Sequence, residues 1–226
     1  MTKHMILALL WLFSASVKAV YFDSIIYEMP ADRDFIAKQL FNDTQKNNIY
    51  TISAYRIDRP GVGGEHRLPM ENGELLYAPL KFSVAANGKE YFKIFYRGPR
   101  DDKERYYRIT FTESPLTLFP LKPADRKTYI FPVVAMNTIL VVRPRTLHFS
   151  YRLDELNGTL QNNGNTFFRV IIQKGCNGDD ESSTQFYMLP GETYKNKSLS
   201  AKNKKYLVAM ERYIKLGKSC FSHPPQ

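Results

Sequence analysis

The chain is a succession of short apolar runs separated by turn-forming residues, and this rhythm restricts the possible folds more than any other feature. Seven runs rich in β-branched and aromatic residues come before Pro144, at residues 20–29, 35–41, 49–57, 75–84, 91–96, 106–112 and 130–142. Such residues favour strands, whereas Asn, Asp, Gly and Pro favour the turns between strands. No stretch of a dozen residues repeats its apolar side chains with the 3.6-residue period of a helix. The pattern therefore predicts an all-β fold with few, short helices.

The number of runs predicts two immunoglobulin-like β-sandwiches. The seven runs before Pro144 match a seven-stranded sandwich. The rhythm restarts after Pro144, with runs at residues 147–153, 158–161, 167–173, 186–189, 206–210 and 213–216. Proline fixes the backbone and cannot continue a strand ladder, so we expect a domain boundary here, between residues 20–143 and residues 144–226. The alternative is a single long sandwich without a boundary.

Residues 1–19 have the pattern of a secretory signal peptide. A short basic start leads into an apolar run at residues 5–13, and Val17-Lys18-Ala19 has the small-residue spacing of a cleavage site. A membrane anchor is the alternative, but this run is much shorter than the ~20 residues that span a bilayer. We therefore expect cleavage after Ala19 and export from the cytoplasm.

Export would place the two cysteines of the chain, Cys176 and Cys220, in an oxidising compartment. The simplest interpretation of such a pair is one disulfide, which would tie together the C-terminal third of the chain. A redox-active pair is disfavoured because the sequence contains no Cys-x-x-Cys motif.

The sequence lacks the residue patterns of common catalytic sites. It contains neither Gly-x-Ser-x-Gly nor His-Glu-x-x-His, and its few histidines lie in unrelated surroundings. We therefore expect no enzymatic activity, no cofactor and no bound metal. The formal net charge of +10 would suit a nucleic-acid partner, but an exported protein rarely meets nucleic acid. We interpret Lys202, Lys204 and Lys205 as a solvated surface run.

Residues 97–108 carry a high density of charge, with five cationic and three acidic side chains. Within this stretch Arg105 and Arg108 flank two tyrosines. Guanidinium groups can stack on aromatic rings and can hold a carboxylate at two points, so the stretch is a candidate ligand-binding site. An internal ion-pair network that shapes the loop is an equally open interpretation.

Residues 130–142 (IFPVVAMNTILVV) are apolar on both faces of the expected strand. A sandwich strand normally alternates, because one face meets the core and the other meets water. A strand that is apolar on both faces either lies in the middle of a two-sided core or faces a partner. At a sheet edge, its unpaired backbone would be a template for a strand of another chain. This segment is the strongest functional signal in the sequence.

Several of these segments together resemble the periplasmic pilus chaperones of the PapD-like family, and they are closest to the EcpE-type branch that serves the common pilus. The most specific matches are GPRDDKERYYRITF at residues 98–111 and MNTILVVRPR at residues 136–145. Shorter matches are GELLYAP at residues 73–79, NGTLQNNGNT at residues 157–166 and YMLPGE at residues 187–192. The resemblance implies two immunoglobulin-like β-sandwich domains in a boomerang arrangement, in a protein of the periplasm.

The resemblance also implies a function. Chaperones of this family lend the last strand of their first domain to a pilus subunit or tip adhesin whose own sandwich lacks a strand, and then deliver it to an outer-membrane usher. The family's alternating donor side chains fall on Ile130, Val134, Met136 and Leu140, although a slip of one residue would exchange the two faces. No cofactor takes part. A dimer in which the free chaperone caps its own donor strand is also compatible with the family.

Two further sets of residues follow from the resemblance. The family's interdomain ion pair would fall on Arg143 and Glu104, with Glu211 as a third, acidic member. The family holds the terminal carboxylate of the subunit with an Arg in the first strand and a Lys in the donor strand. Here residues 20–29 contain no basic residue, and the Lys position is Ile139. We therefore take Arg105 and Arg108 of the charged stretch as candidate substitutes.

The leading hypothesis is a non-enzymatic chaperone for pilus subunits. A structural or adhesive pilus component built from similar sandwiches is the main alternative. Such components carry an N-terminal donor extension, whereas this chain enters a strand almost directly after residue 19. A carbohydrate-binding module is a third hypothesis, which is weakened because the only tryptophan, Trp11, lies in the predicted signal peptide.

Overall fold

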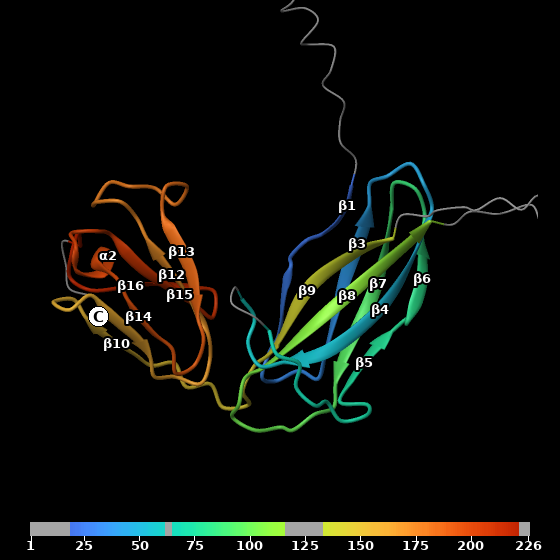
Figure 1. Cartoon of the computed structure of the whole chain (residues 1–226), viewed down its shortest axis with the longest axis horizontal. Coiled ribbons are helices and arrows are strands. Elements are labelled where there is room, and N and C mark those ends of the chain that lie inside the picture. Colours follow the sequence, from blue (N-terminus) through green and yellow to red (C-terminus); the bar gives the residue numbers. More distant parts are fainter. Residues whose placement is uncertain (1–18, 62–64, 116–132, 222–226) are drawn as a thin grey trace, which may run out of the picture.

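The computed structural model describes residues 19–61, 65–115 and 133–221, so the predicted signal peptide lies outside it except for Ala19. Strands dominate, and the one helix among these residues is the four-residue α2 (Lys197–Ser200). The strands form two lobes that are joined at one end and diverge at the other (Figure 1). Each lobe is an immunoglobulin-like β-sandwich, which confirms the prediction of an all-β fold with two such domains in a boomerang arrangement.

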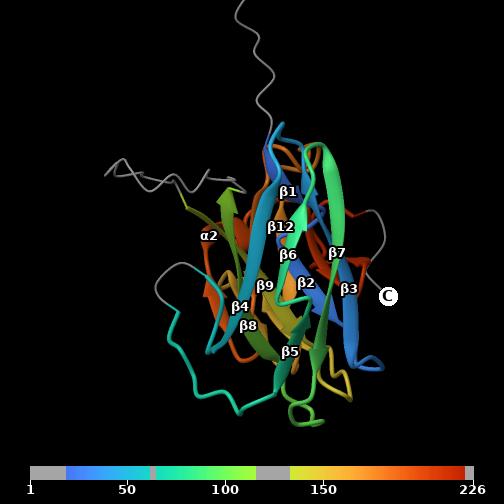
Figure 2. The ribbon, with the colours of Figure 1, turned by 90° about the vertical axis from the view of Figure 1, so that its right-hand side faces the viewer.

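The N-terminal sandwich consists of two sheets. The first has the strand order β1 (Val20–Phe22), β3 (Phe35–Asn42), β7 (Gly88–Tyr96), β5 (Leu75–Ala78). The second has the order β2 (Ile26–Met29), β9 (Val134–Val142), β8 (Arg105–Pro115), β4 (Asn48–Ile57), β6 (Lys81–Val84). Figure 2 shows β3 and β7 on one side of this domain and β4 and β8 on the other. The core between the sheets contains alternate residues of each strand, among them Tyr107, Ile109 and Phe111 of β8.

Two of the predicted runs are each divided between the two sheets. Residues 20–29 form β1 in one sheet and β2 in the other, with a break at Ser24, whose hydroxyl donates to the carbonyl of Ile26 and accepts from its N–H. Residues 75–84 form β5 and β6, which are separated by Pro79-Leu80. Proline lacks the N–H that a continuous ladder needs, so the chain changes sheets there.

The C-terminal sandwich is smaller and also has two sheets. One has the order β10 (Tyr151–Asp154), β11 (Thr159–Asn162), β14 (Thr193–Lys195). The other has the order β13 (Thr184–Met188), β12 (Phe168–Ile172), β15 (Lys205–Ala209), β16 (Arg212–Lys215). The sequence did not predict β14, because its three residues TYK carry no apolar alternation. No strand of one lobe pairs with a strand of the other within the residues described.

Two side-chain predictions for the C-terminal domain have opposite outcomes. The disulfide between Cys176 and Cys220 is present, which confirms the predicted pairing. The interpretation of Lys205 as a solvated residue is wrong, since its side chain has no exposed surface. Its ammonium group donates to Glu155 Oε1 at 3.0 Å and to the carbonyl of Leu199 at 2.7 Å, which compensates the burial of the charge.

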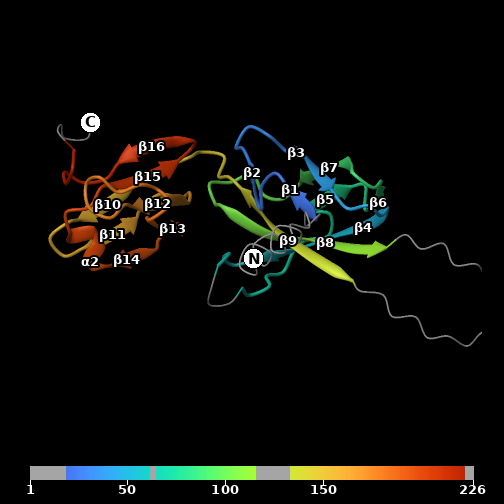
Figure 3. The ribbon, with the colours of Figure 1, turned by 90° about the horizontal axis from the view of Figure 1, so that it is seen from above.

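Each sandwich has its own hydrophobic core, and a third cluster lies where the two lobes meet. The buried members of this third cluster are Ile57, Tyr106, Val141, Phe167 and Leu189. The first three belong to the N-terminal lobe and the other two to the C-terminal lobe. Seen from above, the lobes lie side by side along the long axis, with β8 and β9 in the lobe to the right (Figure 3).

Candidate functional site

Strand β9 is paired on both margins for only half of its length. On one margin it runs antiparallel to β8 from Val134 to Val142. On the other margin β2 pairs with it in parallel, but only from Ile139 to Val142. Residues 134–138 therefore have no neighbour on that margin among the residues described. The prediction of an edge strand applies to this first half and not to the second, and residues 130–132 lie outside the described part of the chain.

The backbone groups that face this free margin follow from the neighbouring hydrogen bonds. The N–H of Ile139 donates to the carbonyl of Ile25 at 2.8 Å, and the N–H of Arg143 donates to that of Met29 at 3.1 Å. Odd-numbered residues of β9 thus direct their backbone groups toward β2. In an antiparallel pair the direction alternates along the strand, so Ala135 and Asn137 direct their N–H and C=O groups into the free margin.

The side chains of β9 alternate between two environments. Met136 is partly buried and packs on the N-terminal core, and Leu140 is completely buried within it. Val134 lies on the same face but is 50% exposed. Leu140 is therefore a core residue, which contradicts its prediction as a subunit contact. Val134 and Met136 remain available near the free margin, and Ile130 lies outside the described residues.

The interdomain ion pair proposed from the resemblance is present as part of a larger network. Arg143 Nη1 lies 3.0 Å from Glu104 Oε2, and both side chains are almost fully buried. A second carboxylate comes from Glu28 of β2, whose Oε2 lies 2.7 Å from Arg143 Nη2. Glu211 was predicted as this third member, but it lies exposed in the β15–β16 turn and makes no ion pair with Arg143 within the described part of the chain.

The C-terminal lobe enters the same network through the segment before β12. Thr166 accepts from Arg143 Nη1 and donates to Glu104 Oε2 at 2.7 Å, and the backbone N–H of Phe167 donates to Glu104 Oε1 at 3.0 Å. The Arg143 guanidinium carbon also lies 4.0 Å from the centre of the Phe167 ring. Burial raises the pKa of Tyr106 well above its usual value, and the nearby Glu104 charge adds to this, so Tyr106 stays protonated and donates to Glu104.

Arg105 and Arg108 do not form a joint carboxylate site. Arg105 shares the parity of the core residues of β8, whereas Arg108 is on the opposite face, because side chains alternate along a strand. Each guanidinium also has its own acid. Arg105 holds Asp101 through two contacts of 2.6 and 2.7 Å, which lowers the pKa of Asp101 to about 2. Arg108 binds Glu65 through both Nε and Nη2. The ion pairs expected of an internal network are therefore present at both arginines.

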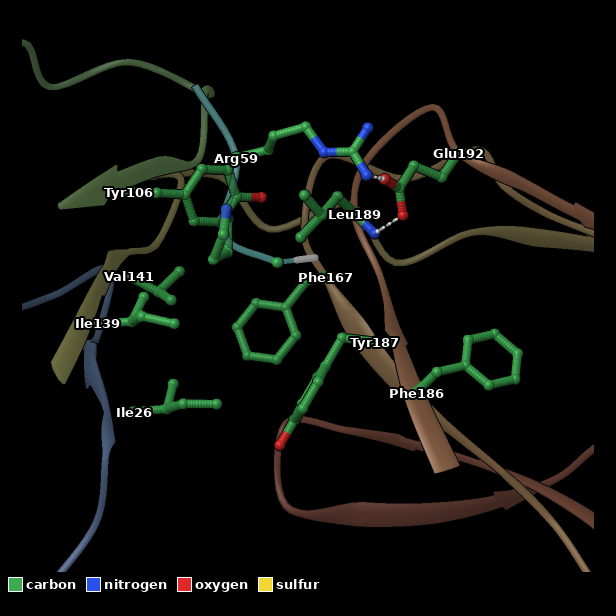
Figure 4. A pocket seen from close by; sticks show the side chains of 12 residues that line it. Ile26, Arg59, Tyr106, Ile139, Val141, Phe167, Phe186, Tyr187, Leu189 and Glu192 are labelled. Carbon is green, nitrogen blue, oxygen red and sulfur yellow. Dashed lines mark hydrogen bonds and ion pairs between the residues drawn. The ribbon is translucent and has the colours of Figure 1, made fainter. Parts of the chain in front are cut away.

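A cavity of about 380 Å³ opens between the two domains at the end of the free margin (Figure 4). Its walls are mainly apolar and come from both lobes: Ile26, Ile139 and Val141 on one side, and Phe167, Tyr187 and Leu189 on the other. Arg59 and Glu192 lie at one end, with Arg59 Nη2 3.3 Å from Glu192 Oε1. Ile139, the family's Lys position, is thus part of an apolar wall.

The sequence did not predict this cavity or the roles of Glu28 and Thr166. All of these residues come from separate strands and turns, and a single sequence does not show which of them meet. The odd-numbered apolar residues of 130–142 were the one available signal, since Ile139 and Val141 supply the cavity face of β9. Within the described ranges there is no group of His, Cys, Asp and Glu that could hold a metal ion, and no helix is long and apolar enough to cross a membrane.

Comparisons with known proteins cover the entire chain. Residues 149–216 match the family described as the EcpB C-terminal domain. The chain is 36% identical to the "Probable fimbrial chaperone EcpE" of Escherichia coli O18:K1:H7 over 226 residues, which is 100% of this chain and 95% of the relative. It is 30% identical to the "Probable fimbrial chaperone EcpB" of Klebsiella pneumoniae strain 342, covering 93% of this chain and 96% of the relative.

Solved structures share the fold at much lower identity. The E. coli chaperone DraB is 12% identical with a TM-score of 0.55, covering 90% of this chain and 98% of DraB. A chain from the Salmonella enterica SafA pilin in complex with the SafB chaperone is 13% identical with a TM-score of 0.51, covering 89% of this chain and 92% of that chain. The full-length identity to EcpE decides the family: the chain belongs to the fimbrial chaperones of which EcpE and EcpB are members.

Proposed function

We propose that the protein binds pilus subunits, including a tip adhesin, by donating the free margin of β9 to a subunit sandwich that lacks a strand. In this proposal residues 1–19 direct the chain to the periplasm and are removed after Ala19. Residues 20–143 form the donor domain and residues 144–226 the second domain. The protein then passes the subunit to an outer-membrane usher without enzymatic activity and without a cofactor.

The unpaired margin of residues 134–138 is the observation that carries the proposal. Native sheets normally protect their edges, and an exposed apolar edge is a hazard unless pairing with another chain is its task. Here the margin offers the N–H and C=O groups of Ala135 and Asn137 beside the exposed Val134. An extended segment of a partner could continue the sheet beyond β9, as in strand addition.

The expected interaction energies show how strongly residues 134–138 alone could bind a partner strand. Four backbone hydrogen bonds contribute about 0.5–1.5 kcal/mol each. Val134 is half exposed and Met136 is already partly buried, so covering them adds less than the about 1.5–3 kcal/mol that full burial of each would give. Association costs about 4–15 kcal/mol, which offsets most of this gain. A stable complex therefore needs further contacts, either from the residues before Val133 or from the interdomain cavity.

The alternative of a structural pilus component receives no support from the N-terminal sandwich. Its two sheets contain all of β1 to β9, and β1 begins at Val20, directly after the predicted cleavage site. Ala19 itself already bonds to this sandwich, since its carbonyl accepts from the N–H of Asp43 at 3.2 Å. The described chain is thus part of the sandwich from Ala19 onward.

Replacement of Ala135 by Pro tests the proposal. Proline removes the N–H that faces the free margin and adds its ring there, whereas the hydrogen bonds to β8 come from even-numbered residues and stay intact. Ala135→Ser is the matched control, because it keeps the N–H. Each variant is co-expressed with the fimbrial subunits of the same operon and purified from periplasm.

We expect Ala135→Ser to retain the subunits and Ala135→Pro to lose them, with similar melting temperatures for the two variants by circular dichroism. Equal recovery of subunits with both variants would show that β9 is not the donor. If Ala135→Pro melts much lower than Ala135→Ser, Asn137→Pro serves as the second variant, since Asn137 also directs its N–H into the free margin.

A further inference from the structure

We propose that the interdomain cavity is a socket for one large apolar side chain, aromatic or aliphatic, of the bound subunit. The inference rests on the proposed function and names a second anchor for the same partner. The family resemblance would lead one to expect a carboxylate in this region, held by a Lys at the position of Ile139. The chemistry of the cavity favours a different occupant.

The walls of the cavity are mainly apolar. Ile26, Ile139 and Val141 face Phe167, Tyr187 and Leu189 across the cavity (Figure 4). Its volume of about 380 Å³ is within the range of pockets that hold small ligands, ~300–1,000 Å³. An apolar side chain gains free energy on leaving water for such a site, whereas a polar group without partners loses it.

The described lining of the cavity offers no unpaired cation. Among the described residues that line the cavity, Arg59 is the only basic one. It is paired with Glu192, whose second oxygen, Oε2, accepts from the N–H of Leu189 at 2.9 Å. The pair is neutral overall and lies at one end. A carboxylate entering between Ile139 and Tyr187 would therefore leave water without gaining a charge-assisted hydrogen bond.

The cavity adjoins the end of the free margin of β9. A strand added beside residues 134–138 must stop where β2 begins, because β2 occupies that margin from Ile139 onward. Ile26, the first residue of β2, is also a wall of the cavity. The end of an added strand thus arrives at the socket, and a side chain from that end can enter it.

One wall of the cavity is partly exposed to solvent. Tyr187 of β13 is 48% exposed, although its ring packs edge-on against Phe167 at 5.7 Å between ring centres. A large aromatic ring half open to water beside an apolar cavity is a typical anchor point, since Tyr is enriched among residues that dominate binding. The ring would be covered by the incoming side chain.

The test exchanges the chemistry of one wall. Ile139→Lys restores the cation of the family position, and Ile139→Met is the matched apolar control. Both are co-expressed with the fimbrial subunits of the same operon, and the recovered subunit is quantified per chaperone. We expect Ile139→Met to retain capture and Ile139→Lys to reduce it about tenfold or more, the effect of losing one dominant contact. Undiminished or increased capture by Ile139→Lys would overturn the socket in favour of a carboxylate site.

A second pair of variants covers the case in which Ile139→Lys fails to fold. Tyr187→Ala shortens the opposite wall, and Tyr213→Ala is its control, because Tyr213 is 59% exposed in the same sheet but does not line the cavity. We expect Tyr187→Ala to reduce subunit capture and Tyr213→Ala to leave it unchanged. Equal capture by these two variants would contradict the socket. If Ala135→Pro abolishes capture while Ile139→Lys and Tyr187→Ala retain it, the socket proposal is wrong and the donor role of β9 is supported. If Ala135→Pro also retains capture, the proposal that β9 is the donor strand is wrong.

Discussion

Arg143 and Glu104 form a buried ion pair at the junction of the two lobes, with 3.0 Å between Nη1 and Oε2. Both residues belong to the N-terminal lobe, yet Glu104 also accepts the backbone N–H of Phe167 from the other lobe. Thr166 bridges the same two charges. The pair therefore fixes the C-terminal lobe through its hydrogen bonds, and Arg143 stacks at 4.0 Å on the ring of Phe167, which lines the interdomain cavity.

Arg143→Ala should lower the free energy of unfolding by about 3–5 kcal/mol. Removal of the guanidinium leaves the Glu104 carboxylate, whose side chain is only 1% exposed, without its counter-charge. Urea titration followed by circular dichroism measures the change. Arg212→Ala is the control, because this exposed arginine of β16 should change the stability by less than about 0.5 kcal/mol. Similar small effects of the two variants would show that the network does not hold the lobes together.

Asp101→Asn should lower the free energy of unfolding at pH 5. Its difference from the wild type should become smaller as the pH falls. Arg105 lowers the pKa of Asp101 from 3.8 to about 2 in the folded protein, so the unfolded chain binds the proton first. The contribution is then fully present above about pH 4 and is lost toward pH 2. The effect should be modest because the Asp101 side chain is 42% exposed and solvent screens the pair.

Urea unfolding of the wild type and of Asp101→Asn at several pH values between 2 and 5 measures this contribution. Arg105→Gln should show the same trend, because the contribution belongs to the pair. A difference from the wild type that stays constant across this range would contradict the assignment of the low pKa to the contact with Arg105.

Arg108→Ala should lower the stability by about 1 kcal/mol and leave subunit capture unchanged. Its guanidinium ties Glu65, in the segment between β4 and β5, to the outer face of β8. Both side chains are less than 20% exposed, which raises the contribution above that of a typical surface pair. Glu65→Gln should produce a similar loss. Loss of capture without loss of stability would restore Arg108 as a candidate for binding the carboxylate of a subunit.

Reduction of the Cys176–Cys220 disulfide should destabilise the C-terminal domain by about 2–4 kcal/mol. The bond joins residues that are 44 positions apart, and a cross-link of this span removes freedom from the unfolded chain. Hydrogen exchange with and without dithiothreitol measures the change for each domain. Protection in β8 and β4 should be retained, because the N-terminal core contains no cysteine. Equal loss of protection in both domains would contradict a local role for the bond.

The order and type of the strands could be predicted from local patterns. Alternating apolar residues and the turn formers between them act within a few positions along the chain, so runs such as 106–112 were visible without any tertiary information. The prediction failed where one run serves two sheets, as at Pro79, and where a short strand such as β14 has no apolar alternation. In these places the neighbouring strands determine the pairing, and not the local propensity.

The binding site was only partly visible in the sequence. The apolar run at residues 130–142 marked β9, and family motifs placed Arg143 and Glu104 near the hinge. The sequence could not show that β2 covers half of one margin, or that Leu140 is in the core while Ile139 lines a cavity. Nor could it show that Arg105 and Arg108 are already paired with Asp101 and Glu65. Apart from the local pair of Arg105 and Asp101, these facts depend on contacts between residues far apart in the sequence, such as Ile26 and Ile139, and these contacts exist only after the sheets have packed.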